Sequence, residues 1–163
     1  MISADSGLTS TGHITTEGRT MRFDNTLSIN APVDDVFAYL AQPENLPRWN
    51  YALSHTEKTS PGPISVGATY RQTRTIPRPA EEHFRITAYE PPKLLTMEGD
   101  FGPFTGTTSY QLTPLDRYTT RLVNVFHLTA PGALKPIAAI GGAPVKHAVA
   151  KNLTVLKRIL ESQ

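Results

Sequence analysis

Cysteine is absent from the 163-residue chain. Its absence excludes disulfide bonds, thiolate zinc sites and cysteine nucleophiles, and it fits a reducing compartment. The first 20 residues lack the basic start and apolar stretch of a signal peptide. No run approaches the roughly 20 apolar residues of a membrane span. We therefore expect a cytoplasmic protein that does not span a membrane.

The sequence also lacks a large excess of charge of either sign, and it lacks the common catalytic motifs. The formal net charge is only +2, and the basic residues near the C-terminus are not interleaved with aromatic ones, so nucleic acid is not an expected partner. The five histidines have no metal-ligand spacing, and HExxH, GxSxG and phosphate-loop patterns are missing. We expect no metal and no cofactor.

The composition of the chain indicates a single domain that follows an N-terminal tail. Residues 1–20 are rich in Ser, Thr and Gly and predict a flexible N-terminal tail, while residues 21–163 suit a single domain. Apolar residues alternate over 21–29, which predicts a half-buried strand. A helix is expected after Ala31-Pro32, because proline is tolerated in a first turn, and a second short helical turn is expected before Trp49.

Residues 51–129 predict a meander of strands. Proline- and glycine-containing breaks divide this stretch into six short segments, so that seven strands result when 21–29 is included. No helical segment separates them, which favours an antiparallel sheet over a parallel βαβ sheet.

The C-terminal segment changes to a helical period. Apolar residues from Ile137 to Leu160 form one stripe, which predicts a long helix. Gly141, Gly142 and Pro144 interrupt it, and the proline predicts a kink or break there. Small residues at this point would leave room for a neighbouring side chain or for a ligand.

Four stretches carry a family resemblance: SINAPVDDVFAYLAQPENLPRWN (28–50), SVGATY (65–70), YEPP (89–92) and NLTVLKRILES (152–162). With them the chain resembles the polyketide cyclase/dehydrase-like branch of the SRPBCC (START/Bet v1-like) superfamily over residues 21–162. The resemblance implies an α+β helix-grip fold, in which a seven-stranded curved antiparallel sheet surrounds a long C-terminal helix and two short helices follow the first strand. It also implies a cavity between sheet and helix, with its mouth near residues 61–65, 90–93, 115–118 and 131–136.

Candidate site residues follow from strand alternation and from this resemblance. Tyr70, Gln72 and Arg74 share one strand face, which the resemblance places inward. The candidate ligand-binding residues are Trp49, Tyr70, Gln72, Arg74, Tyr89, Tyr110, Asn124, Phe126, Ile137, Ile140 and Gly141.

Several of these residues have a purely structural alternative. Trp49 can be a wall for stacking a ligand or a plug beneath the short helices. Arg74 can hold a ligand anion or carbonyl, or form an ion pair with Glu98 or another acid. His83 can carry protons or simply face solvent, and Glu98 can act as an acid–base group or be solvated.

Three functions remain open at this stage. The first is binding or carriage of a small hydrophobic ligand, such as a lipid, polyketide or aromatic molecule. The second is a cofactor-independent cyclase, aromatase or dehydratase with Arg74, Tyr70, His83 and Glu98 as candidate catalytic residues. Family aromatase/cyclases place an arginine where this chain has Tyr89, a departure from their pattern. The third is a ligand-free structural or regulatory domain, which can form a homodimer through a sheet edge or the basic helix.

Overall fold

A computed structural model describes residues 8–9, 14–17, 19–130 and 142–163. Its strands are β1 (Leu8–Thr9), β2 (Thr15–Glu17), β3 (Thr20–Ile29), β4 (Leu53–Lys58), β5 (Thr69–Arg74), β6 (Ala80–Glu90), β7 (Leu94–Phe101), β8 (Phe104–Asp116) and β9 (Thr119–Thr129). Its helices are α1 (Val33–Leu40), the 3-10 turn η1 (Pro43–Asn45), α2 (Leu46–Trp49) and α4 (Gly142–Glu161).

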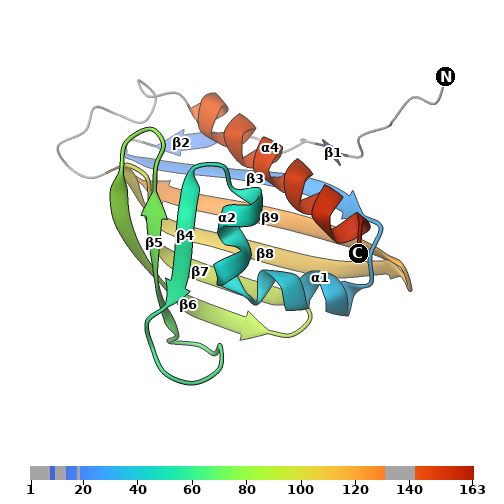
Figure 1. Ribbon diagram of the computed structural model, residues 1–163. Coiled ribbons are helices and arrows are strands. Elements are labelled where there is room, and N and C mark those ends of the chain that lie inside the picture. Colours follow the sequence, from blue (N-terminus) through green and yellow to red (C-terminus); the bar gives the residue numbers. More distant parts are fainter. Residues whose placement is uncertain (1–7, 10–13, 18, 131–141) are drawn as a thin grey trace.

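The strands form one antiparallel sheet in the order β1-β3-β9-β8-β7-β6-β5-β4, and β2 also pairs with β3. The first long strand therefore lies beside the last one, while β4 to β9 follow one another as a meander. The curved sheet bends around α4, and α1 and α2 lie beside that helix (Figure 1). These features confirm the helix-grip fold, with its seven main strands and its two short helices after β3. The short strands β1 and β2 come from the segment expected to be a tail.

Alternation along the strands separates the two faces of the sheet. In β3, Met21, Phe23, Leu27 and Ile29 are almost fully buried, and so is Asn25 between them. Successive side chains of a strand point to opposite faces, so these residues face α4 and the core. Helix α1 follows Pro32, carries Asp34 and Asp35 in its first turn, and buries one apolar side.

Helix α4 packs on the concave face of the sheet. Leu153, Leu156 and Leu160 are buried in the main core cluster. The C-terminal end of the helix is tied to the chain after β3, because Lys157 Nζ donates to the carbonyl of Ser28 at 2.6 Å and Glu161 accepts from the backbone N–H of Asn30 at 2.8 Å.

The expected kink at Pro144 is not found in the described helix. Helix α4 begins at Gly142, so Pro144 lies in its first turn. Amide groups of a first turn have no helical partner, and a proline there removes no hydrogen bond. The predicted stripe from Ile137 extends through residues 131–141, which lie outside the described part of the chain, so the break predicted there stays a prediction.

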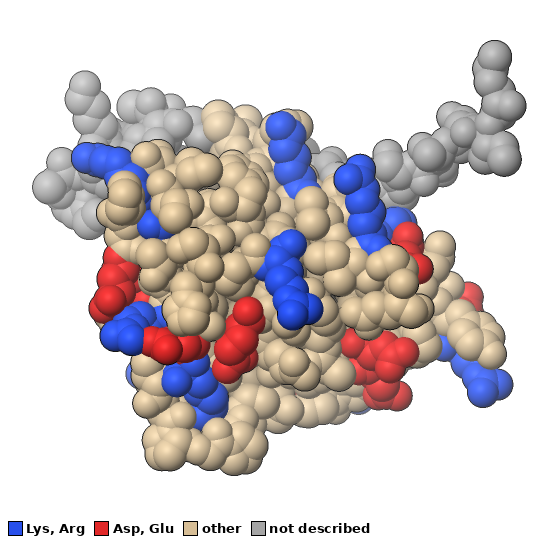
Figure 2. All heavy atoms as spheres, in the orientation of Figure 1, with Lys and Arg blue, Asp and Glu red and all other residues tan. Residues whose placement is uncertain are grey.

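Basic side chains form no continuous patch on the face of the molecule that carries α4. Over α4 the lysine and arginine side chains stand apart, and near β4 and β5 they adjoin acidic side chains (Figure 2). This distribution fits a solvated outer face.

Candidate functional site: a cavity between the sheet and the last helix

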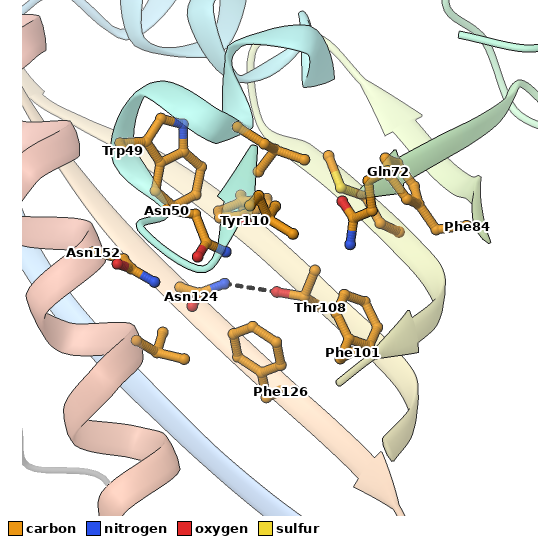
Figure 3. Close-up of a pocket in the computed structure, with 14 residues that line it drawn as sticks. Trp49, Asn50, Gln72, Phe84, Phe101, Thr108, Tyr110, Asn124, Phe126 and Asn152 are labelled. Atoms are coloured by element: carbon orange, nitrogen blue, oxygen red, sulfur yellow. Dashed lines mark hydrogen bonds between the residues drawn. The ribbon is translucent and has the colours of Figure 1, made fainter. Parts of the chain in front are cut away.

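A cavity of about 50 Å³ lies where the concave face of the sheet meets α2 and α4 (Figure 3). It is lined by Leu46, Trp49, Asn50, Leu53, Gln72, Phe84, Met97, Phe101, Thr108, Tyr110, Asn124, Phe126, Val149 and Asn152. This volume accommodates a few water molecules or one functional group, and not a whole ligand.

The cavity adjoins a wider opening of about 340 Å³. The two spaces share five lining residues, which are Asn50, Phe101, Phe126, Val149 and Asn152. Most other walls of the opening are apolar, including the exposed Ile76 and Pro103 and the partly buried Ala148. An apolar molecule can therefore lie in the opening and reach into the cavity.

The opening is at the end of the sheet opposite to the predicted mouth. It lies beside the β5–β6 and β7–β8 turns, near Pro77 and Pro103. The predicted turns, at residues 61–65, 90–93 and 115–118, connect β4–β5, β6–β7 and β8–β9. Successive turns of a meander alternate between its two ends, so these turns share the other end. There α1 packs against the sheet, with Phe37 and Tyr89 rings 5.7 Å apart. Residues 131–136 are outside the described residues.

Aromatic rings form much of the cavity wall. The rings of Trp49 and Tyr110 meet edge to face at 6.3 Å, and those of Phe101 and Phe126 do so at 5.7 Å. Phe126 also stacks on Phe23 at 5.1 Å. Packed rings of this kind make a stiff apolar wall.

Asn124 is the most deeply buried polar residue of the cavity wall, with 1% of its surface exposed. Its side-chain nitrogen donates to Thr108 Oγ1 at 2.9 Å (Figure 3) and also to the carbonyl of Ser109 at 3.2 Å. Because the carbonyl of Ser109 can only accept a hydrogen bond, the side-chain atom of Asn124 that faces it must be the nitrogen. Asn124 Oδ1 is buried and has no partner among the described residues. A buried acceptor without a partner needs water, a ligand donor or a neighbouring side-chain donor; the amide of Asn25, opposite Asn124 on β3, also has no partner among the described residues.

The other polar groups of the cavity are also neutral. Asn50 Oδ1 accepts from the N–H of Ala52 at 3.1 Å, and Asn152 Oδ1 accepts from the N–H of Tyr51 at 3.4 Å. Burial raises the pKa of the Tyr110 phenol, so this group keeps its proton over the physiological range. The described lining of the cavity contains no Asp, Glu, Lys, Arg or His.

A buried carboxylate, Glu82, organises the opening. It is 2% exposed and accepts from Gln72 Nε2 at 2.7 Å and from the backbone N–H of Gly102 at 2.7 Å. Arg74 donates to it from both Nε and Nη2. Gly102 is at φ +64°, a conformation that favours glycine, and this turn brings its N–H to the carboxylate. Glu82 thus joins β5, β6 and the β7–β8 turn.

The structure brings together six of the eleven predicted ligand-binding residues. Trp49, Gln72, Tyr110, Asn124 and Phe126 line the cavity, and Arg74 lies at its opening. Tyr70 is instead buried in the core, stacked on Phe84 at 5.0 Å, and burial raises its pKa to about 12. Tyr89 packs on Phe37, away from the cavity. Ile137, Ile140 and Gly141 lie outside the described residues.

The four candidate catalytic residues do not all converge: Tyr70, His83 and Glu98 border an open hollow of about 510 Å³, while Arg74 lies at the opening of the cavity. Arg74 pairs with Glu82, and not with Glu98. Glu98 pairs with Arg85 at 3.0 Å on the outer face of the sheet. His83 lies exposed on the same outer face, with Nε2 3.4 Å from a carboxylate oxygen of Glu81, and Tyr70 is in the core.

Sequence reasoning missed several residues of the site, most of all Glu82, Asn152 and Thr108. Two patterns in the sequence could have identified Asn152 and Glu82. Asn152 interrupts the apolar stripe of α4, between Val149 and Leu156 on one helix side. Glu82 has the same strand parity as the core residue Phe84, which places a carboxylate on the inner face.

Two further properties concern only the described residues. Their histidine, aspartate and glutamate side chains include no group of three that could hold a metal ion. None of their helices is long and apolar enough to cross a membrane.

The sheet, the C-terminal helix and the cavity between them define a helix-grip protein with an internal pocket. The sequence model of the family described as "Polyketide cyclase / dehydrase and lipid transport" matches residues 20–161. The chain therefore belongs to this family. No curated protein matches its sequence.

Solved structures share the fold at low sequence identity. The Zhui aromatase/cyclase from a Streptomyces species is 17% identical, with a TM-score of 0.69 over 85% of this chain and 93% of that one. The di-domain aromatase/cyclase StfQ of the steffimycin pathway is 15% identical, with a TM-score of 0.70 over 88% of this chain and 51% of that one. The major latex-like protein 151 of Panax ginseng is 12% identical, with a TM-score of 0.67 over 88% and 99%.

Proposed function

We propose that this protein binds or carries a small, mainly apolar ligand in the cavity and its opening. The observation that carries this proposal is the unpartnered Oδ1 of Asn124, buried in an aromatic wall that continues into an apolar opening of about 340 Å³. Mostly apolar pockets with a few convergent polar groups are the usual form of small-molecule sites.

The dimensions indicate how the ligand lies. The inner cavity of about 50 Å³ takes a single functional group, so the body of the ligand occupies the opening between α4 and the β7–β8 turn. Ala148 and Val149 of α4 border the opening. The family description, which includes lipid transport, supports a ligand of this kind.

Binding is better supported than catalysis by the arrangement of polar residues. A cyclase- or dehydratase-type reaction needs acid, base or electrophilic groups that reach one reacting centre. Arg74, Tyr70, His83 and Glu98 occupy the opening, the core and the outer face. Two of the similar structures are titled aromatase/cyclases, so turnover remains the second hypothesis.

Trp49 provides the assay. It is the single tryptophan and lines the cavity, so its fluorescence should change when an apolar probe such as 2-naphthol binds. Calorimetric titration then gives the affinity, and native mass spectrometry of the purified protein detects a co-purifying ligand.

A matched pair of variants tests the location. Ala148→Phe fills the opening and should weaken 2-naphthol binding about tenfold or more, because one aromatic ring would displace the probe. Lys151→Phe places the same side chain at an exposed position of α4 and should leave the affinity unchanged. Equal affinities of Ala148→Phe and the wild type, or no binding by the wild type, would refute the proposal.

A further inference from the structure

The electrostatic character of the site limits the chemistry of its ligand. The described lining of the inner cavity offers amides, a hydroxyl, a phenol and apolar groups, and no charged side chain. A charged group that enters such a cavity loses its hydration without gaining an opposite charge. The ligand group that enters should therefore be uncharged.

Asn124 determines which hydrogen-bonding group the ligand should carry. Its Oδ1 atom is an acceptor with no partner among the described residues, while its nitrogen is occupied by Thr108 and Ser109. A hydroxyl or N–H of a ligand can donate to this atom, and it replaces the hydrogen bond that a bound water would make. An apolar ligand without a donor leaves the acceptor unsatisfied.

Arg74 is the only charged residue in the described lining of the opening, and Glu82 neutralises it. The Arg74 side chain is 13% exposed and the Glu82 side chain 3% exposed, and two hydrogen bonds join them. A bidentate pair of this kind presents little net charge to a molecule in the opening. Without Glu82, the same arginine would attract anions.

We propose that the site selects uncharged apolar ligands that carry a hydroxyl or N–H donor, and that Glu82 sets this preference by cancelling the charge of Arg74. The inference rests on the proposed function, since it concerns the same cavity. It assigns Asn124 as the contact with the donor and Glu82 as a positioning residue that decides specificity without touching the ligand.

Three naphthalene probes test the inference by calorimetric titration at neutral pH. They are 2-naphthol, which is neutral with a donor, naphthalene, which has no donor, and 2-naphthoate, which is an anion. We expect the wild type to bind 2-naphthol about threefold to tenfold more tightly than naphthalene, the effect of one hydrogen bond. It should bind 2-naphthoate at least about tenfold more weakly than 2-naphthol. Asn124→Leu should abolish the advantage of 2-naphthol over naphthalene.

Glu82→Gln should strengthen 2-naphthoate binding about tenfold, because Arg74 becomes an uncompensated cation. Glu98→Gln removes a carboxylate from the outer face and serves as the matched control. Its ratio of 2-naphthoate affinity to 2-naphthol affinity should equal that of the wild type. The double variant Arg74→Met/Glu82→Met removes both charges and should bind 2-naphthoate with the weak affinity of the wild type, because the wild-type pair already presents little net charge to the opening. It also keeps the idea testable if Glu82→Gln does not fold.

The outcomes separate the two proposals. If no probe binds the wild type, the proposed function itself fails. If the wild type binds all three probes equally, or prefers 2-naphthoate, the ligand class inferred here is wrong while binding stands. If Glu82→Gln fails to strengthen 2-naphthoate binding, or weakens it, Glu82 does not set the preference. If Glu82→Gln does not fold and the double variant binds 2-naphthoate with an affinity different from that of the wild type, Glu82 does not cancel the charge of Arg74 and the inference fails as well.

Discussion

The contrast between a buried and an exposed ion pair gives the sharpest stability prediction. Glu82→Gln keeps the size of the side chain but removes the charge that faces Arg74. Glu82 is almost fully buried and accepts hydrogen bonds from Gln72, Arg74 and Gly102. The variant leaves a mostly buried guanidinium without its counter-charge.

The magnitude follows from this geometry. Breaking a buried pair by removing one partner costs about 3–5 kcal/mol. Arg74 borders the opening and the new amide oxygen still accepts a hydrogen bond, so we expect a value near the lower end, about 3 kcal/mol. Glu98→Gln breaks the pair with Arg85, whose side chains are 45% and 61% exposed, and should cost less than about 1 kcal/mol.

Urea unfolding at neutral pH, followed by Trp49 fluorescence and circular dichroism, measures both variants. The linear dependence of the free energy of unfolding on urea gives the difference between them. Arg74→Met/Glu82→Met should recover most of the lost stability, because apolar side chains of similar volume often replace a buried pair without loss. Equal free energies of unfolding for Glu82→Gln and Glu98→Gln would refute this reasoning, because the buried Arg74–Glu82 pair would then contribute no more to stability than the exposed Arg85–Glu98 pair.

Other predictions concern the core and the backbone. Leu153→Ala, at a fully buried position of α4, should lower the free energy of unfolding by about 3 kcal/mol, whereas Val155→Ala on the exposed side should change it by less than about 0.5 kcal/mol in urea titrations. Gly106→Ala should lower the melting temperature, because the new Cβ would lie 1.9 Å from the carbonyl oxygen of His127. The pKa of Tyr70 is raised to about 12. An unfolded tyrosine ionises near pH 10, so its contribution is complete below about pH 10 and is lost as the pH rises towards 12. Tyr70→Phe should flatten this alkaline loss of stability, and an unchanged pH profile would contradict the assignment.

Local patterns were sufficient to predict the elements of the fold. The alternation of apolar residues over 21–29 predicted β3, and the proline and glycine breaks between 51 and 129 predicted six strands that the structure confirms as β4 to β9. The same period of two put Asn124 and Phe126 on one strand face but did not decide whether that face points inward, because Val123 and Val125 make the opposite face apolar as well. These predictions succeed because strand and turn preferences depend on near neighbours along the chain.

The location of the mouth could not be obtained in this way. It was predicted at turns that α1 covers in the structure, whereas the opening lies beside Pro77 and Pro103. Which end of a meander stays open depends on where α1, α2 and α4 pack, and the spacing of the turns is the same at both ends.

The sequence by itself determined the order of strands and helices and, through its resemblance, the family. The tertiary structure decided that Glu82 rather than Glu98 meets Arg74, that Tyr70 lies in the core, and that Asn124 is left with a free acceptor. Each of these facts depends on contacts between residues on different strands, such as β5 with β6 and β8 with β9. Periodicity specifies the face on which a side chain lies; the partner that it meets there depends on strand register and on the packing of the helices.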